Sequence, residues 1–416
     1  MLADSELPVP HSRNNGGWPP MTQQAGRMAR QLPTLNGLRG IAAVTVFFSH
    51  TTLFGFFADE RVDDWWYTVL SRTGSAALGF FFILSGFVLT WSAPDHEPNR
   101  RFWRRRAARI LPNHLVVCAV FIVLLILVRG GAPLWPTLAN VTLVQSWIPD
   151  EFIFNGINPP SWSLSCEIFF YASFPWLLAG IRRLSAAGLW SIAGGIVAAM
   201  LVAPVVSTAF LPDEPTYTYA DAAFPQFWFV QQFPLIRMLD FVLGIVIAQL
   251  VMRGAWIRLS LPAAGLVTLA FYGVSEVVPL LYSVVAAMVI PLALLVAAAA
   301  RADVEGHRSP LRGRVAGWLG DTSFAFYLIH ILVLYGAGNM SPSGFGVAAA
   351  LAVMVGAYLA TLGLASLLHI GVERPMMRRF ARSRKPAAAP QPTAVATAPP
   401  PIEPLPVATA DGTRVG

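Results

Sequence analysis

The sequence predicts an all-α integral membrane protein with ten transmembrane helices and both termini in the cytoplasm. Two features of the 416-residue chain support this fold class, because 55% of its residues are hydrophobic and only 12% are charged. A soluble domain carries about 25% charged residues. It also has to keep polar groups on its surface, so it has no place for this much apolar side chain. The third feature is the length and spacing of the apolar segments.

Ten apolar segments are long enough to cross a hydrocarbon core, a distance that takes about 20 helical residues. The break between the seventh and eighth segments is short and lies at Val278 and Pro279. An even number of spans places both ends of the chain on one side of the membrane. The segments lie near residues 36–57, 74–93, 109–128, 161–181, 187–209, 235–252, 258–275, 279–300, 318–337 and 346–370.

Basic residues alternate between the connecting loops, and this alternation predicts the orientation. Short loops rich in arginine stay in the cytoplasm. The opposite loops hold only Arg61, Arg72 and Arg129 and are otherwise acidic. We therefore expect a multi-pass protein of the cell membrane, the inner or plasma membrane of a bacterium. The arginine-rich stretches are residues 100–109, 182–183, 253–258, 301–314 and 374–385.

The chain divides into a membrane domain at residues 34–380 and two tails. Residues 1–33 are polar and without periodicity, and residues 381–416 form a low-complexity stretch rich in Pro and Ala. We expect both tails to be cytoplasmic and disordered. The net charge of +7 could suggest nucleic acid, but the charges lie in short loops beside the bilayer. Membrane lipid headgroups or an anionic substrate are the expected partners, and nucleic acid is not.

Two ionisable residues share the first apolar segment. Arg39 and His50 are eleven positions apart, so on a helix they lie on one face and about 16 Å from each other. Ionisable groups are costly at membrane depth and are therefore functional candidates. The alternative is an arginine that snorkels to the interface and a hydrogen-bonded packing histidine.

The fourth segment contains a carboxylate near its start. Pro159 and Pro160 precede the segment, and Ser161 is expected to cap it. Glu167 follows about one and a half turns later, where a lone carboxylate needs a partner or a proton. It could instead be an acid favoured by the positive end of the helix dipole.

Other polar residues in the apolar segments have simpler explanations. Ser85-Gly86 is expected to be a notch where another helix packs closely. Arg237 and Asp240 have the i, i+3 spacing of a local ion pair.

Three further histidines lie in or beside apolar segments. His330 is a second imidazole at membrane depth and belongs either to the packing or to the functional site. His114 and His369 have no neighbouring pattern and are expected to be structural.

The arginine cluster at residues 100–109 is denser than topology requires. Guanidinium forks suit phosphates, so a polyanion site is one interpretation, and orientation with lipid contact is the other. The sequence contains no Walker loop, dinucleotide glycine fingerprint, Cys-x-x-Cys or His-Glu-x-x-His. Nucleotide hydrolysis and a zinc-peptidase site therefore lack support, and we expect no metal.

Taken in order, these motifs resemble the acyltransferase-3 family of integral membrane O-acyltransferases. The resemblance covers about residues 34–380. It runs from residues 35–40 through His50, residues 81–87, Arg105, Arg106, Arg109, Ile110, Pro112, residues 162–164, Glu167, Tyr171, Arg237, Asp240, Phe241, Gly244, Ser323, Tyr327, Leu328, His330, Glu373 and Pro375.

The resemblance implies ten helices, acyl-CoA as donor, and a functional role for Arg39 and His50. The implied acceptor is a hydroxyl of a sugar, a polysaccharide or lipid-linked glycan of the cell envelope, or a glycosylated natural product. This chain resembles the stand-alone form of the family, without a fused esterase-like domain.

On this basis His50 is expected to be the general base or to carry the acyl group, with Glu167 orienting it or tuning its charge. Neutral imidazole is the working form, because desolvation disfavours the cation. The expected phosphate ligands of coenzyme A are Arg39, Arg105, Arg106 and Arg109, and the expected acceptor pocket contains Ser85, Trp162, Arg237 and His330.

Two other functions remain open at this point. A transporter of a sugar, lipid or antibiotic would also use paired buried charges, but the sequence shows no internal repeat. A structural membrane scaffold would leave His50, Glu167 and Arg237 without a purpose.

Overall fold

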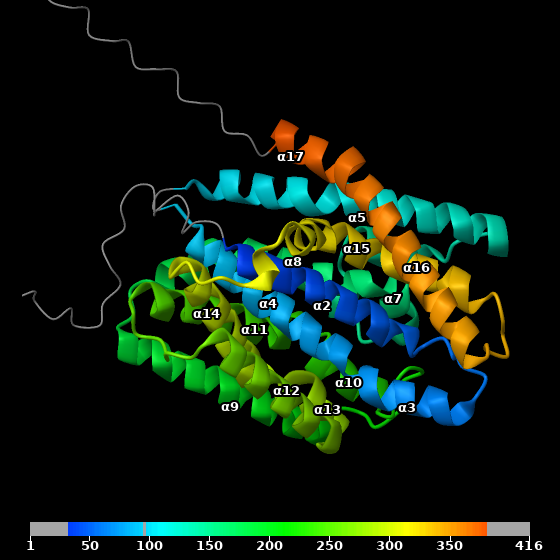
Figure 1. Cartoon of the computed structure of the whole chain (residues 1–416), viewed down its shortest axis with the longest axis horizontal. Coiled ribbons are helices and arrows are strands. Elements are labelled where there is room, and N and C mark those ends of the chain that lie inside the picture. Colours follow the sequence, from blue (N-terminus) through cyan, green and yellow to red (C-terminus); the bar gives the residue numbers. More distant parts are fainter. Residues whose placement is uncertain (1–31, 95–96, 381–416) are drawn as a thin grey trace, which may run out of the picture. The chain divides into compact units, whose positions relative to one another are not determined.

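The computed structural model describes residues 32–94 and 97–380. Within these residues it consists of helices, turns and loops without a β-strand, so the predicted all-α class is confirmed (Figure 1). The two predicted tails, apart from residues 32 and 33, lie outside the described residues. The principal helices are α2 (Pro33–Thr51), α3 (Glu60–Leu70), α4 (Thr73–Trp91), α5 (Asn99–Arg129), α6 (Leu134–Val141), α7 (Glu151–Asn155), α8 (Trp162–Ile181), α9 (Ala186–Phe210), α10 (Phe224–Gln231), α11 (Pro234–Met252), α12 (Leu261–Val277), α13 (Leu280–Val285), α14 (Val289–Val304), α15 (Arg314–Gly338), α16 (Val347–Leu368) and α17 (Arg374–Phe380).

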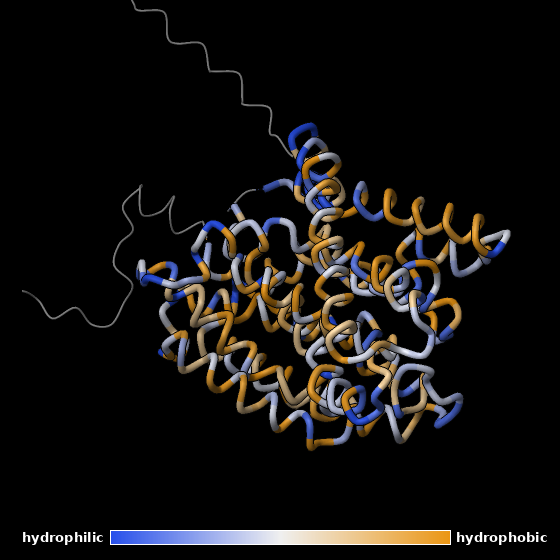
Figure 2. The backbone as a smooth tube through the Cα atoms, turned by 45° about the vertical axis from the view of Figure 1, so that its right-hand side comes forward, coloured by the Kyte–Doolittle hydropathy of each residue, from blue (hydrophilic) through white to orange (hydrophobic). Residues whose placement is uncertain are grey.

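Within the described residues, eight helical segments are long and apolar enough to cross a membrane. Figure 2 shows the hydrophobic stretches running along these helices. The other two expected spans are also helical. α12 has only 17 residues, and α2 carries the polar residues Asn36, Arg39 and His50, which lower its mean hydropathy.

The start of α2 is held by a carboxylate from α14. Asp303 accepts hydrogen bonds from the Thr34 backbone N–H at 2.9 and 3.1 Å and from the Thr34 hydroxyl at 2.6 Å. The first N–H groups of a helix have no partner within it, so this buried contact satisfies one of them. The negative charge of Asp303 also interacts favourably with the positive end of the helix dipole.

Glycines allow α2 and α15 to touch along their length. A side chain at Gly40 would crowd Leu319 and Gly320, and one at Gly320 would overlap the backbone of Asn36. The Asn36 amide donates to the Gly317 carbonyl at 3.0 Å. Small residues let membrane helices approach closely, which fixes the position of α2 against α15.

A second close contact joins α4 and α11, and here the glycines are reciprocal. A Cβ at Gly86 would overlap the Phe241 carbonyl oxygen, and a Cβ at Gly244 would overlap the Ile83 carbonyl oxygen. The predicted packing notch is therefore confirmed at Gly86, and its partner is Gly244. This contact holds α4 in place beside the cavities described below.

The predicted cap at Ser161 is wrong. Residues Pro159–Ser161 form a 3-10 turn that continues directly into α8, and Ser161 itself has helical angles. A capping residue needs extended angles, so its side chain cannot serve the helix start. The Ser161 hydroxyl instead lies 2.8 Å from Asn140 Oδ1 and accepts from the Gln145 amide at 3.0 Å.

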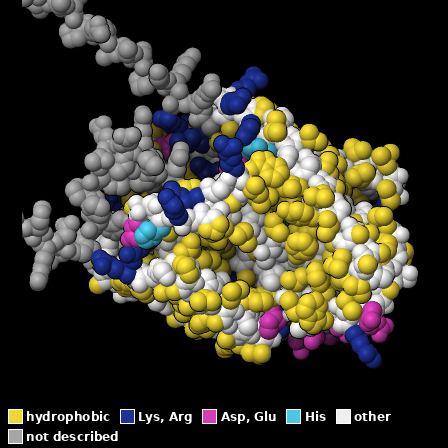
Figure 3. Space-filling view, in the orientation of Figure 1, with side chains coloured by type: hydrophobic (Ala, Val, Ile, Leu, Met, Phe, Trp, Pro, Cys, Tyr) yellow, Lys and Arg dark blue, Asp and Glu magenta, His cyan; other side chains and the backbone are white. Residues whose placement is uncertain are grey.

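Charged side chains gather at opposite ends of the helices. In Figure 3 most of the basic side chains lie at the upper left, and most of the acidic ones lie along the lower edge and at the lower right, towards α3. The acids of that helix include Glu60, Asp63 and Asp64.

We expect Gly244→Ala to destabilise the protein, because the added methyl group would press on the Ile83 carbonyl of α4. Overpacking of this kind costs about 1–3 kcal/mol. Gly195→Ala in α9 is the matched control, since its Cβ would meet nothing within 4 Å. Thermal unfolding in detergent, followed by tryptophan fluorescence, should show a lower midpoint for the first variant alone. Equal midpoints would contradict the close packing of α4 and α11.

Candidate active site

Three cavities lie one after another along α4. The first touches Gly74, Ser75 and Leu78, the second touches Leu78 again, and the third touches Leu89. At 1.5 Å per residue, Ser75 and Leu89 are about 21 Å apart along the helix. We call them the histidine cavity, the arginine–glutamate cavity and the arginine cavity, after the residues described next.

The histidine cavity has a volume of about 160 Å³. His50 lies in its wall, and the expected pocket residue Trp162 does too. The remaining polar and aromatic lining combines amides, hydroxyls and rings, which suits a ligand with both polar and apolar faces. These residues are Ser49, Thr52, Tyr67, Ser71, Arg72, Ser75, Tyr217, Tyr219, Phe227, Gln231 and Gln232.

His50 is paired with the second histidine at membrane depth. His330 Nε2 lies 3.2 Å from His50 Nδ1, and the ring centres are 4.9 Å apart. His50 Nδ1 also lies 2.9 Å from the Val46 carbonyl oxygen. A carbonyl can only accept a hydrogen bond, so Nδ1 of neutral His50 carries the proton. Nε2, on the other edge of the ring, then has a free lone pair.

Tyr327 holds the segment of α15 that carries His330. Its hydroxyl donates to the Pro160 carbonyl at 2.8 Å and accepts from the Ser163 hydroxyl at 2.9 Å. The Asn158 amide donates to the Leu328 carbonyl at 3.2 Å. The turn before α8 is thereby tied to α15 one turn before His330.

The arginine–glutamate cavity, of about 70 Å³, brings two expected site residues together. Arg39 and Glu167 both line it, with Ser163 and Tyr327. The Glu167 carboxylate interacts electrostatically with the Tyr171 hydroxyl and with arginines that include Arg39. A carboxylate at this depth needs such partners. Nδ1 of His50 has the Val46 carbonyl and His330 as its partners rather than Glu167. The expectation that Glu167 orients or charge-tunes His50 therefore stays a prediction.

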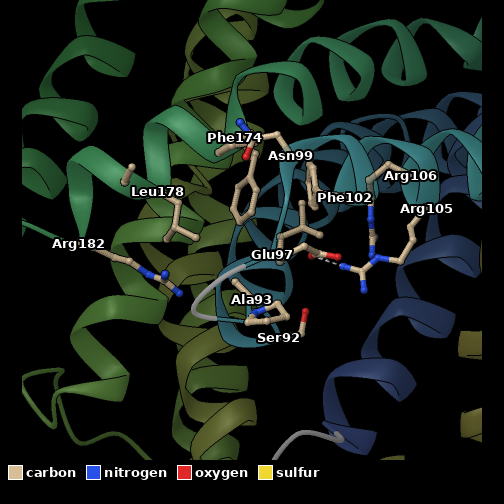
Figure 4. A pocket seen from close by; sticks show the side chains of 14 residues that line it. Ser92, Ala93, Glu97, Asn99, Phe102, Arg105, Arg106, Phe174, Leu178 and Arg182 are labelled. Carbon is tan, nitrogen blue, oxygen red and sulfur yellow. Dashed lines mark hydrogen bonds and ion pairs between the residues drawn. The ribbon is translucent and has the colours of Figure 1, made fainter. Parts of the chain in front are cut away.

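The arginine cavity lies at the other end of α4 and has a volume of about 190 Å³. Figure 4 shows Arg182 on one side and Arg105 and Arg106 on the other, with Glu97 between them. Arg105 forms an ion pair with Glu97. The Arg106 guanidinium lies over the Phe102 ring, 5.8 Å from its centre.

Two of these residues were missed as site residues. In the sequence, Arg182 belongs to a short basic loop that indicates only the membrane orientation. Glu97 lies in no recognisable motif. Another expected phosphate ligand, Arg109, is placed deeper, within electrostatic reach of Arg39 and Glu167.

Comparison with known proteins assigns this arrangement to a family. A family model described as an acyltransferase domain matches residues 32–370, a range that contains every residue lining the three cavities. The chain belongs to the acyltransferase-3 family. It is therefore an O-acyltransferase rather than a transporter or a scaffold, and it is a multi-pass membrane protein.

Two curated relatives are similar to this acyltransferase. Acyltransferase MdmB of Streptomyces mycarofaciens is 40% identical over 383 residues, which cover 87% of this chain and 96% of the relative. Nodulation protein 10 of Rhizobium leguminosarum bv. viciae is 29% identical over 222 residues, which cover 48% of this chain and 58% of the relative. No solved structure matches the chain significantly.

Two expected pocket residues of the acyltransferase lie elsewhere. Arg237 and Asp240 form the predicted ion pair at 2.7 Å, and both side chains are almost fully buried. The Arg237 guanidinium also lies over the Phe82 ring, 5.5 Å from its centre. The Ser85 hydroxyl lies 3.1 Å from the Tyr171 hydroxyl, in the packing between α4 and α8.

The two histidines that were expected to be structural have local partners in the acyltransferase. His114 Nε2 lies 3.0 Å from the Asn140 carbonyl oxygen, and His369 Nδ1 lies 2.9 Å from the Glu373 carboxylate. Within residues 32–94 and 97–380, no group of three His, Cys, Asp or Glu side chains is placed to hold a metal ion.

Proposed function

We propose that this acyltransferase binds acyl-CoA at the arginine cavity and transfers the acyl group to a neutral hydroxylated acceptor in the histidine cavity. His50 acts as the general base. The observation that carries the proposal is the position of His50 in the wall of a cavity, with its Nδ1 next to the Val46 carbonyl so that Nε2 is left to accept a proton. The acceptor is a sugar, a polysaccharide or lipid-linked glycan, or a glycosylated natural product.

The charge of the arginine cavity supports the donor site. Three arginines line this cavity, two from α5 and one directly after the end of α8, and guanidinium forks bind phosphate oxygens in pairs. Coenzyme A carries several phosphates at one end and the thioester at the other. Its phosphates would replace Glu97 as the partner of Arg105. Its arm would then pass Arg39 along α4 and bring the thioester toward His50.

The lining of the histidine cavity supports a neutral acceptor. Among its described residues Arg72 has the one formal charge, and that group is already engaged. Arg72 donates to the Ser275 carbonyl and to the Val278 carbonyl, the latter at 3.0 Å, and lies 3.6 Å from Glu276. What remains for a ligand is aromatic surface, amides and hydroxyls, which suits a sugar ring and its substituents.

The transfer step then needs one base. His50 Nε2 removes the proton of the acceptor hydroxyl while its oxygen attacks the thioester carbonyl carbon. The carbon–oxygen bond forms, the carbon–sulfur bond breaks, and the coenzyme A thiolate leaves. It takes up the proton from His50, so the products are the acyl ester and coenzyme A, and the imidazole is neutral again.

The ten-span topology, with both termini in the cytoplasm of a bacterium, completes the proposal. It places the arginine cavity on the cytoplasmic side, where acyl-CoA is found. The separation of basic and acidic ends supports this orientation (Figure 3).

The orientation predicts the accessibility of two loops. In a Cys118→Ala/Cys166→Ala background, a membrane-impermeant maleimide applied to intact spheroplasts should label Asp213→Cys and leave Arg104→Cys unlabelled. Both sites should react after the cells are opened. Labelling of position 104 from outside would reverse the orientation and separate the arginine cavity from its donor.

The donor site predicts that Arg105→Gln combined with Arg106→Gln weakens binding of coenzyme A by about tenfold or more. One lost hydrogen bond to a charged group is worth about 1.5–3 kcal/mol, and about 1.4 kcal/mol is a factor of ten. Calorimetric titration of the purified protein with coenzyme A measures the effect. Arg104→Gln is the matched control, because Arg104 belongs to the same helix but is exposed. Unchanged affinity in the double variant would leave the cluster with a topological role only.

The catalytic role predicts that His50→Gln lowers transfer by about 10²–10⁴-fold, the usual contribution of a general base. Glutamine retains hydrogen bonding but is not basic. Transfer is measured as radiolabel moving from acetyl-CoA into cell material of the native host, and coenzyme A affinity should stay unchanged.

His307→Gln is the matched control, since His307 is an exposed surface histidine. Activity within tenfold of the unsubstituted enzyme in His50→Gln would remove His50 from the chemistry. Label trapped covalently on His50 would instead show that the acyl group passes through this residue.

A further inference from the structure

The pairing of His50 with His330 carries an inference beyond the general base itself. The two side chains come from α2 and α15, 280 positions apart in the chain, and approach to 3.2 Å between His330 Nε2 and His50 Nδ1. His330 is almost completely buried, whereas His50 is half-buried and lines the histidine cavity. The ring that meets the ligand is therefore backed by a ring that is shielded from it.

Backbone carbonyls determine which nitrogen of each ring carries the proton. His330 Nδ1 lies 2.6 Å from the Tyr327 carbonyl oxygen, and His50 Nδ1 lies 2.9 Å from that of Val46. Both nitrogens must donate, because a carbonyl oxygen has no proton to give. In their neutral forms both rings are then Nδ1–H tautomers, and Nε2 of each ring has a lone pair.

The alternative arrangements are unfavourable. If His330 Nε2 donated to His50 Nδ1 in neutral rings, the lone pairs of both Nδ1 atoms would face carbonyl oxygens at 2.9 and 2.6 Å. A doubly protonated His330 would place a cation in a buried site where the described structure offers it no carboxylate. The Nδ1–H of His50 is consequently shared between the Val46 carbonyl and His330 Nε2.

We propose that His330 is a positioning residue that acts through His50. It accepts a hydrogen bond from His50 Nδ1–H and so keeps Nε2 of His50 unprotonated and turned to the histidine cavity. When Nε2 takes the acceptor proton, His50 becomes a cation and this hydrogen bond becomes charge-assisted, which makes it stronger. His330 stays neutral throughout and receives no proton. The inference rests on the proposed role of His50 as base.

Nitrogen-15 NMR of the full-length protein with labelled histidine tests the tautomer directly. The chain has seven histidines, so the signal lost in His50→Gln identifies His50. We expect His50 in the unsubstituted protein to show the Nδ1–H tautomer, although a free histidine side chain favours Nε2–H in water. An Nε2–H tautomer for His50 would overturn the inference. This measurement does not need activity, so its outcome is independent of whether His50→Gln abolishes transfer.

Two substitutions of His330 test its effect on transfer. His330→Leu removes the acceptor and should lower kcat by about ten- to a hundredfold, the equivalent of one hydrogen bond to a charged group, with KM for acetyl-CoA unchanged. His330→Gln offers a carbonyl oxygen near the former Nε2 and should restore most of the rate. Unchanged kcat in His330→Leu would overturn the proposal. Equal losses in both variants, together with weaker coenzyme A binding, would reduce His330 to a packing residue and overturn it as well.

Discussion

The placement of α2 between α4 and α15 is the constraint on which the rest of the site depends. Its first turn is held by Asp303, and its flank lies against α15 through glycines that permit backbone contact. A helix that carries Arg39 and His50 is poorly suited to face lipid, where a charged side chain is expensive. Surrounding it with other helices removes this cost and at the same time brings His50 against His330.

Polar groups at membrane depth are handled in two ways in this molecule. Arg237 with Asp240 and His369 with Glu373 form local pairs within one helix region, in which each charged group has a partner of its own. Arg39 and Glu167 instead face a cavity. The distinction matters because a local pair stabilises packing, whereas charges that face a cavity are available to a ligand.

The cavities along α4 suggest why the site needs both charged and uncharged sections. The arginine cavity is strongly basic, whereas the one charge lining the histidine cavity among the described residues is already engaged by α12 and its end. A donor with an anionic end and an uncharged reactive end suits such a gradient. The proposed acceptor enters the section in which a neutral hydroxyl can meet a neutral base.

The sequence by itself determined the membrane class, the helix-rich fold and the family. It also singled out the two segments that carry Arg39, His50 and Glu167. Composition and the length of the apolar segments decide the membrane class and the helix-rich fold, because a helix that crosses hydrocarbon needs about 20 mostly apolar residues. The family follows from the order of the motifs along the chain. The i, i+3 pair of Arg237 and Asp240 was also predictable, since local spacing fixes it. Two expected spans, α2 and α12, are not among the helices that are long and apolar enough to cross a membrane. The polar residues of α2 and the short length of α12 account for this.

Only the tertiary structure decided which of these side chains contact each other. His330 was expected in the acceptor pocket, yet the helices bring it to His50, and they bring Glu167 to Arg39. Arg182 joined the arginine cavity from another helix. Each helix shows its own faces in the sequence, but the rotation of one helix against another depends on contacts such as those at Gly86, Gly244 and Gly320. These contacts join residues far apart in the chain, and no local pattern encodes such a pairing.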